Sequence, residues 1–257
     1  MKTMKKENWR KENWIATARY EARALRQELR RVRGNVSAWK QFWRSYQAYC
    51  RMGPAAPPEM RTLLPCLYDN TATTVIEPTY FYQDAWAFEK IVEANPARHI
   101  DIGSHHKFVA LLSKVVPVTM VDIRPLSLPL ASLNFQAGSI LEMPYPDGAC
   151  ESISSMCVIE HIGLGRYGDP LDLHGTEKAL AELKRITAPG GNLYLSVPVD
   201  DINRTYFNAH RAFSEPYLLE IFAPFEVRER RYIYEKFSET LGTGFGTGCY
   251  HLRRPLR

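Results

Sequence analysis

Two acidic residues stand at the ends of short apolar runs in the middle of the chain. Asp101 ends the first run and is followed by Gly103 and Ser104. Asp122 ends the second run about 20 residues later, a spacing known from dinucleotide-binding folds, and Ile123 follows it. A glycine at such a turn lets the backbone approach a nucleotide, and a carboxylate at the tip of the next strand can accept both hydroxyls of a ribose. The two runs favour a nucleotide-type ligand at the carboxyl edge of a sheet.

A second group of polar residues follows later apolar runs. Glu160 and His161 come directly after one run, and Asn208, His210 and Arg211 lie in a polar segment beyond the next. Because histidine titrates near neutrality, His161 and His210 are candidate general bases, although a structural histidine that caps a loop also fits His161. Glu160 could hold a cofactor or orient His161. Arg211 suits a carboxylate or phosphate on a substrate, and a surface loop pinned by ion pairs explains it equally well.

Glycine and charge dominate the segment 163–170, which contains Tyr167. A substrate lid has this composition, and so has any flexible loop. Tyr167 is therefore a candidate substrate-binding residue, together with Asn208 and Arg211.

The elements that must position these residues alternate between apolar runs and helical patterns. Seven strands are predicted, at Arg98–Ile102, Val118–Ile123, Asn134–Ala137, Cys150–Met156, Asn192–Val197, Phe225–Ile233 and Cys249–Arg253. Such alternation predicts an α/β fold with a mostly parallel sheet and helices on both faces. Only the last two strands lack a helix between them, so we expect them to pair antiparallel.

The first 52 residues differ from the rest of the chain. They carry 14 Lys and Arg against 4 Asp and Glu, a net charge of +10, whereas the whole chain carries +5. Apolar spacing predicts a helical hairpin that breaks at Gly34-Asn35, with Trp39, Phe42, Trp43, Tyr46 and Tyr49 on one face of its second helix. The proline-rich stretch that follows cannot continue a helix.

This pattern predicts a basic helical appendage at 1–52, a linker at 53–78 and an α/β domain at 79–257. The excess of basic residues favours an anionic partner, such as nucleic acid, a lipid surface or an acidic face in a homo-oligomer, over a neutral one. A merely solvated helix face explains the charge equally well.

The composition limits the remaining classes. No apolar run approaches the roughly 20 residues that span a bilayer. The charged start of the chain does not resemble a secretory signal. Five scattered cysteines include no CxxC pair and no Cys/His cluster at zinc-ligand spacing, so no metal site is expected and reduced thiols in a cytoplasm fit best.

The motifs also follow one another in a specific order. After the two acid-tipped runs come G-S-I-L-E-M-P-Y-P-D at 138–147, V-I-E-H-I at 158–162 and L-K-R-I-T-A-P-G-G-N-L-Y-L-S-V-P at 183–198. In this order the segments resemble the class I S-adenosylmethionine (SAM)-dependent methyltransferases, well over 98–200 and loosely beyond. The resemblance implies a Rossmann-like seven-stranded fold and SAM as the cofactor.

The resemblance also implies roles for individual residues. Those that would contact SAM are Asp101, Gly103 and Ser104 at the methionine end, Asp122 at the ribose, Ile123, Ser139 and Ile140 at the adenine, and Cys157 beneath the cofactor. The chain departs from the family pattern in two places: histidines follow Gly103 where further glycines are usual, and Ser139 stands where an acid often lies near the adenine amine. The single-glycine D-I-G-S turn and F-N-A-H-R at 207–211 are closer to a methyltransferase-like group of unknown function.

Missing motifs narrow the methyl acceptor. The chain has Cys157-Val158-Ile159-Glu160 where enzymes that methylate base amines have Asn or Asp, two prolines and an aromatic residue, and no proline precedes Cys157 as in cytosine-carbon enzymes. We therefore expect a small polar or saccharide-type acceptor, methylated at oxygen. Two alternatives stay open: a methyltransferase that acts on nucleic acid or at a lipid surface through the basic arm, and a non-catalytic scaffold. A nicotinamide dehydrogenase is disfavoured because G-x-G-x-x-G is absent after the first strand.

Overall fold

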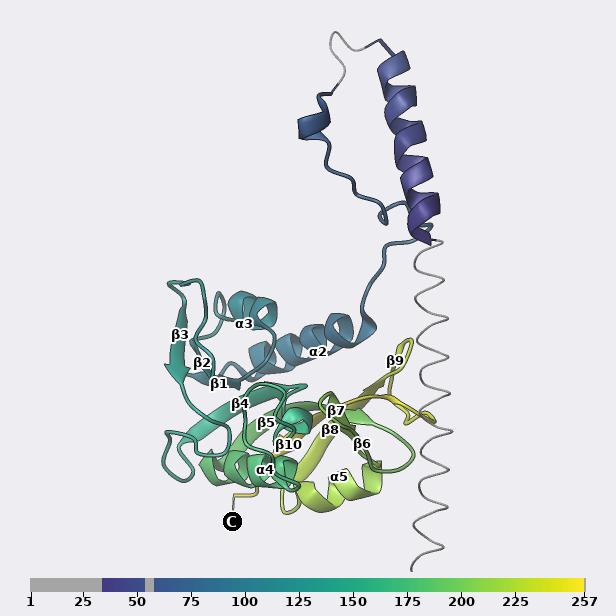
Figure 1. Cartoon of the computed structure of the whole chain (residues 1–257). Coiled ribbons are helices and arrows are strands. Elements are labelled where there is room, and N and C mark those ends of the chain that lie inside the picture. Colours follow the sequence, from purple (N-terminus) through teal and green to yellow (C-terminus); the bar gives the residue numbers. More distant parts are fainter. Residues whose placement is uncertain (1–33, 54–57, 257) are drawn as a thin grey trace, which may run out of the picture. The chain divides into compact units, whose positions relative to one another are not determined.

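The computed structural model describes residues 34–53 and 58–256, which Figure 1 draws as ribbon. The chain divides into two compact units, Met1–Val75 and Ile76–Arg257. Each unit is described separately below.

The first unit contains one described α-helix, over residues 34–51. Gly34 and Asn35, where a break is predicted, are both helical, and the residues before them lie outside the described part of the chain, so the break stays a prediction. The first helix of the predicted hairpin lies outside the described residues. After the helix, a 3-10 turn η1 (Met60–Thr62) follows, and the Tyr46 hydroxyl donates to the Pro58 carbonyl at 3.2 Å.

The second unit is an eight-stranded sheet with helices on both faces (Figure 1). Its strands lie in the order β3-β2-β1-β4-β5-β10-β8-β9. Their bounds are β1 His99–Ile102, β2 Val118–Asp122, β3 Leu133–Ala137, β4 Cys150–Met156, β5 Thr187–Val199, β8 Glu226–Ile233, β9 Phe237–Ser238 and β10 Gly246–Arg253. The first five pair parallel, and β10 lies antiparallel between β5 and β8. The predicted fold class is confirmed, including the antiparallel pairing of the last two long strands.

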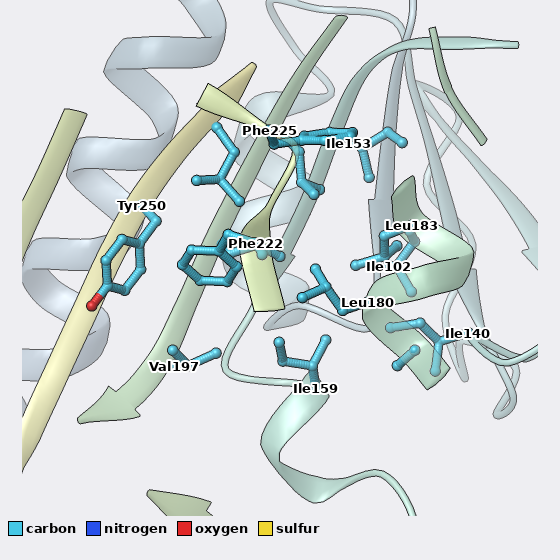
Figure 2. Packing of buried hydrophobic residues seen from close by; sticks show 14 of the residues in the cluster. Ile102, Ile140, Ile153, Ile159, Leu180, Leu183, Val197, Phe222, Phe225 and Tyr250 are labelled. Atoms are coloured by element: carbon cyan, nitrogen blue, oxygen red, sulfur yellow. The ribbon is translucent and has the colours of Figure 1, made fainter. Parts of the chain in front are cut away.

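Two buried clusters, one on each face, hold the helices to the sheet. Helices α4 (Gly175–Ile186) and α5 (Glu215–Phe222) supply Leu180, Leu183 and Phe222 to one cluster, which Figure 2 shows packed against Ile153 and Tyr250 of the sheet. Helices α2 (Pro78–Ala94) and α3 (His106–Leu112) cover the other face. Since the central strands are buried on both sides, their carboxyl ends are held rigidly at one edge.

Three short strands were not predicted. Strands β6 (Arg204–Tyr206) and β7 (His210–Ala212) form a separate antiparallel hairpin, and β9 pairs with the end of β8. Such two- or three-residue strands carry no period-2 pattern that a sequence can show. Strand β5 also begins five residues before its predicted start, because Pro189-Gly190-Gly191 continues the strand across an irregularity in its pairing with β4.

Candidate cofactor and acceptor site

Two neighbouring cavities open where β1, β2 and β4 end. The first has a volume of about 520 Å³ and the second about 990 Å³. Both are lined by Gly103, Asp122, Cys157, His161 and Tyr167. The shared wall makes them two compartments of one cleft, at the edge of an α/β sheet where ligands bind.

Gly103 forms the floor between strand β1 and helix α3. Its φ of +68° is a left-handed conformation, and a Cβ atom there would lie 3.2 Å from Val158 Cγ1 and 3.9 Å from Asp122 Oδ2. Any side chain at this position would be strained and would fill the space beside the Asp122 carboxylate. The single glycine therefore keeps open the passage between the two compartments.

Asp122 stands at the tip of β2 and faces both compartments. Its Oδ1 accepts the Arg124 backbone N–H at 2.8 Å and lies 3.5 Å from the Arg124 Nε. Its Oδ2 has no protein donor among the hydrogen bonds of the described residues, so it is free to accept from a ligand in the cleft. The predicted ribose-binding carboxylate is thus placed where a ribose could reach it.

Asp101 does not line either compartment, contrary to the prediction that it contacts the cofactor. It is fully buried. Its Oδ1 accepts the Ser104 N–H at 3.1 Å and its Oδ2 accepts the Ser154 hydroxyl at 2.6 Å. The physical reason is the strand period: Asp101 faces the layer under α2 and α3, where Ser104 and Ser154 satisfy both oxygens before a ligand can.

The bonds of Asp101 continue into a buried polar network. The His99 ring bonds to Ser152 Oγ and Ser154 Oγ, each at 2.8 Å, and Ser104 Oγ accepts the Met156 N–H at 3.0 Å. Burial lowers the pKa of His99 to about 3, which keeps its ring neutral. The network ties the loop after β1 to β4 and so sets the position of the cleft floor.

Replacing Asp101 by alanine should lower the free energy of unfolding by about 2–4 kcal/mol, because the Ser104 N–H and Ser154 lose their acceptor. Asp101→Asn should keep most of that stability, since an amide can serve both partners. Burial raises the pKa of Asp101 to about 6, so its stabilising contribution is present below the unfolded value of 3.8 and is lost as pH rises through 6. Denaturant unfolding from about pH 4 to pH 7 should show that decline in the wild type and not in Asp101→Asn; equal slopes would contradict it.

The predicted adenine-side residues line the first compartment. Ile123, Ser139 and Ile140 are all part of its wall. The Ser139 hydroxyl accepts the Leu141 N–H at 3.2 Å, which fixes the turn after β3. This wall combines apolar surface with one hydroxyl, which suits a flat heteroaromatic ring.

Cys157 follows β4 in a left-handed conformation, with φ of +54°, and lines both compartments. Its thiol donates to Gln83 Oε1 at 3.2 Å, and the Ser196 hydroxyl donates to the same oxygen at 2.7 Å. Burial and the neighbouring Glu160 raise the pKa of the thiol well above its usual value, so it stays protonated. A thiol in this state is no nucleophile, in agreement with the absence of a cytosine-carbon motif.

Glu160 carries the least satisfied polar group of the cleft. It lines the second compartment, is 1% exposed, and its Oε2 has no hydrogen-bond partner within 34–53 and 58–256. Its Oε1 lies 3.6 Å from His161 Nε2. Burial raises the pKa of this carboxyl to about 8. A buried oxygen without a partner costs free energy unless a ligand supplies a donor.

His161 lies beside Glu160 at the boundary of the two compartments. Its Nδ1 is 2.6 Å from the Ala209 carbonyl, so the ring proton is on Nδ1 and the Nε2 lone pair is free. Desolvation lowers its pKa to about 4. His210 lines the second compartment, and burial together with Arg166 lowers its pKa as well. Both rings are therefore neutral proton acceptors at physiological pH.

The segment 163–170 closes one side of the cleft through Tyr167. The guanidinium of Arg124 lies 4.5 Å from the centre of the Tyr167 ring and that of Arg166 lies 5.0 Å from it. Asp169 holds the loop by accepting the backbone N–H groups of Gly163 at 2.6 Å and Tyr167 at 3.2 Å. The loop is thus built around Tyr167 rather than merely flexible.

Two predicted substrate-binding residues lie away from the cavities. Asn208, at φ +61°, forms the exposed turn between β6 and β7. The Arg211 side chain is buried and donates to the Ile162 carbonyl at 2.5 Å, the Asp172 carbonyl at 2.9 Å and Thr176 Oγ1 at 3.3 Å. Their role in substrate binding stays a prediction, and the Arg211 guanidinium is directed instead at Ile162, Asp172 and Thr176.

Arg211→Ala should lower the free energy of unfolding by about 3 kcal/mol, since it leaves two buried carbonyls and a hydroxyl without donors. Arg211→Lys should recover only part of that loss, because an ammonium cannot span both carbonyls as the guanidinium fork does. Denaturant unfolding measures the difference, and Arg204→Ala on the exposed hairpin is the matched control. A loss no larger than that of the control would remove Arg211 from this role.

Several cleft residues were not predicted. They are Tyr80, Arg124, Arg166 and Phe245, which line the second compartment. Arg124 alone had a usable signal, since it follows Asp122 by two residues. The others come from α2, from the loop and from the turn before β10, which only the folded sheet brings together. Within 34–53 and 58–256, no group of three His, Cys, Asp or Glu residues could hold a metal ion.

Sequence comparisons give little direct information. Residues 145–238 match the model of a family described as Caenorhabditis protein of unknown function, DUF268. That segment includes Cys157, Glu160 and His161. A search of curated proteins found no match.

Solved structures match most of the second unit. N-methyltransferase NodS from Bradyrhizobium japonicum WM9 is 14% identical over 69% of this chain and 97% of its own, with a TM-score of 0.52. The [4+2]-cyclase SpnF is 14% identical over 68% and 82%, with a TM-score of 0.52. The 1,6-didemethyltoxoflavin-N1-methyltransferase of Burkholderia thailandensis, which contains S-adenosylhomocysteine, is 17% identical over 72% and 93%, with a TM-score of 0.50. By its strand order and these matches, the chain has the fold of the class I SAM-dependent methyltransferases.

Proposed function

We propose that the protein binds SAM in the cleft and transfers its methyl group to a hydroxyl of a small polar or saccharide-type acceptor. The observation that carries this proposal is the pair of joined compartments at the ends of β1, β2 and β4, with the Asp122 carboxylate facing both. The first compartment would take the adenosine and the second the methionine half with the acceptor. A fold alone does not decide the reaction, since one structural match is a cyclase.

The residues fit SAM in three respects. Gly103 leaves a space that a Cβ atom would fill, beside the Asp122 oxygen that would receive the ribose. Ile123 and Ile140 offer apolar surface to the adenine. The unpartnered Glu160 Oε2 would accept the α-ammonium of the methionine half.

When bound, SAM supplies a sulfonium methyl that is already a good electrophile. The protein must then align the acceptor and remove one proton from it. The free Nε2 of His161 would take that proton, with Nδ1 anchored on the Ala209 carbonyl. His210 would orient the acceptor or serve as a second base from the other side of the compartment. The mixture of rings, hydroxyls and guanidinium groups around this compartment supports a polar acceptor.

His161→Gln should lower the turnover of methyl transfer by about 10²–10⁴-fold, because an amide cannot accept the proton. The affinity for SAM should change little. Turnover is followed as S-adenosylhomocysteine release with the identified acceptor, and His174→Gln, at an exposed histidine outside both compartments, is the control. Unchanged turnover would eliminate His161 as the base.

Two measurements test the proposed function. Isothermal titration calorimetry with SAM should give a single site, and no binding would favour the non-catalytic scaffold. Incubation of the protein and SAM with a cell extract, followed by untargeted mass spectrometry, should show a polar metabolite that gains one methylene. A product methylated at nitrogen or on nucleic acid would overturn the assignment of the acceptor and leave the SAM site standing.

A further inference from the structure

The helix at 34–51 presents an aromatic face. Trp39, Phe42, Trp43 and Tyr46 follow one another at spacings of three and four residues, and their rings touch in sequence, with centroids 5.2–6.4 Å apart. The two tryptophans remain exposed to solvent despite these ring contacts, since Trp39 is 40% exposed and Trp43 is 38% exposed. An indole face left this exposed, next to further exposed aromatic rings, marks an interaction surface.

Positive charge flanks this aromatic face. Between residues 34 and 58 the chain carries Lys40, Arg44 and Arg51 and no acidic residue. At 100° per residue, all three lie on one side of the helix, adjacent to the aromatic stripe. The residues that precede the helix in the sequence add to the same excess, since 1–52 carries a net charge of +10.

A bilayer interface matches both properties at once. Tryptophan and tyrosine prefer the headgroup level, where the ring is apolar and its N–H or O–H stays wet, and lysine and arginine beside them attract anionic lipid. A double-stranded nucleic acid would use the cations on its phosphates and leave the aromatic rings without a partner. A single strand can stack its bases on exposed rings, and the oligonucleotide measurement below distinguishes it from a lipid surface. The described residues contain no helix that could cross a bilayer, so the contact would be one along the surface.

We propose that the helix at 34–51 docks the protein on anionic lipid surfaces, with Trp39, Phe42, Trp43 and Tyr46 inserted at the headgroup level and Lys40, Arg44 and Arg51 facing the anionic headgroups. This inference rests on the first unit alone and does not depend on the proposed methyl transfer. It gives the basic N-terminal segment a role in locating the protein.

Co-flotation of the full-length protein with lipid vesicles tests the proposal. The wild type should bind vesicles of phosphatidylcholine mixed with an equal amount of phosphatidylglycerol, and bind vesicles of phosphatidylcholine alone at least about tenfold more weakly. The charge variant Lys40→Glu with Arg44→Glu and the aromatic variant Trp39→Ser with Trp43→Ser should each reduce binding to the anionic vesicles by about tenfold or more.

Lys114→Glu with Lys236→Glu is the matched control, because it makes the same change of charge at exposed lysines of the second unit. It should bind vesicles like the wild type. Circular dichroism and thermal melting confirm that each variant is folded. SAM affinity, which reports on the other unit, should be equal in all of them.

Three outcomes would overturn the proposal. The wild type could fail to bind anionic vesicles, or both helix variants could bind as well as the control. In the third outcome the wild type does not bind vesicles but binds a fluorescent single-stranded oligonucleotide or forms dimers. The aromatic variant is then defective in oligonucleotide binding or in dimer formation. That result would assign the helix to nucleic acid or to a second copy of the chain.

Discussion

Asp122→Ala should weaken SAM binding by about 100-fold or more, measured by isothermal titration calorimetry. A ribose gives two hydroxyl donors to this carboxylate, and a hydrogen bond to a charged acceptor in a water-poor cleft contributes about 1.5–3 kcal/mol. The side chain is well placed for both, since it faces the two compartments and its Oδ2 has no donor from the described part of the chain. The SAM affinity of Asp122→Asn should lie between those of the wild type and Asp122→Ala, because the amide retains one acceptor oxygen.

The fold should survive these changes. Among the described residues Asp122 accepts only the Arg124 N–H and makes a partly exposed ion pair with the same residue, a contribution of about 1 kcal/mol. Asp147→Ala is the matched control, because it removes another carboxylate that is paired with an arginine, Arg185, and that lines neither compartment. If Asp122→Ala binds SAM as tightly as that control, Asp122 does not hold the ribose.

The positions of Asp122 and Gly103 could be predicted from the sequence because they depend on local rules. A parallel strand that ends in an acid puts that acid at the sheet edge, and a turn with φ near +68° needs glycine. The alternation of apolar runs with helical patterns likewise predicted the five parallel strands and the antiparallel pair. These signals all lie within a few residues of the feature they predict.

The side-chain contacts that the sequence did not indicate concern residues whose partners are distant in the sequence. Asp101 and Asp122 look equivalent in the sequence, yet Ser154, 53 residues away, takes an oxygen of Asp101 and keeps it in the interior. Arg211 looks like a free cation in the sequence, yet its guanidinium donates to the carbonyls of Ile162, after η2, and Asp172, in the loop before α4. A polar residue near a strand end becomes a ligand contact only when the fold leaves its atoms unpaired, and the sequence does not show that.

Glu160 differs from Asp101 and Arg211, because its proposed role depends on a carboxylate oxygen that has no partner among the described residues. Its Oε2 is buried without a partner from the part of the chain that the structure describes, and burial raises the pKa of its carboxyl to about 8. Two neighbouring groups do not compete for protons near neutrality, since the pKa of His161 is about 4 and that of the Cys157 thiol lies well above its usual value. Any proton exchanged near pH 7 when SAM binds should therefore come from Glu160 or from SAM itself.

The affinity for SAM should consequently pass through a maximum near pH 8. Below that pH the empty site holds a proton on Glu160 that must leave before the carboxylate can pair with the α-ammonium, whose own pKa is about 7.7–8.0. Above it the ammonium loses its proton. At pH 7 a net release of about 0.8 proton should accompany each SAM bound, since Glu160 loses its proton and the α-ammonium takes up a small fraction of one. Calorimetry in phosphate and in Tris measures this release as a difference in apparent enthalpy.

Glu160→Gln should abolish that release and flatten the dependence of affinity on pH below 8, because an amide has no proton to lose. SAM affinity at pH 8 should fall by about tenfold or more with the loss of the charged partner. His161→Gln should keep both the proton release and the maximum, since its ring is neutral throughout. If Glu160→Gln releases as many protons as the wild type, the buried carboxyl does not receive the ammonium, and Glu160 acts instead by orienting His161.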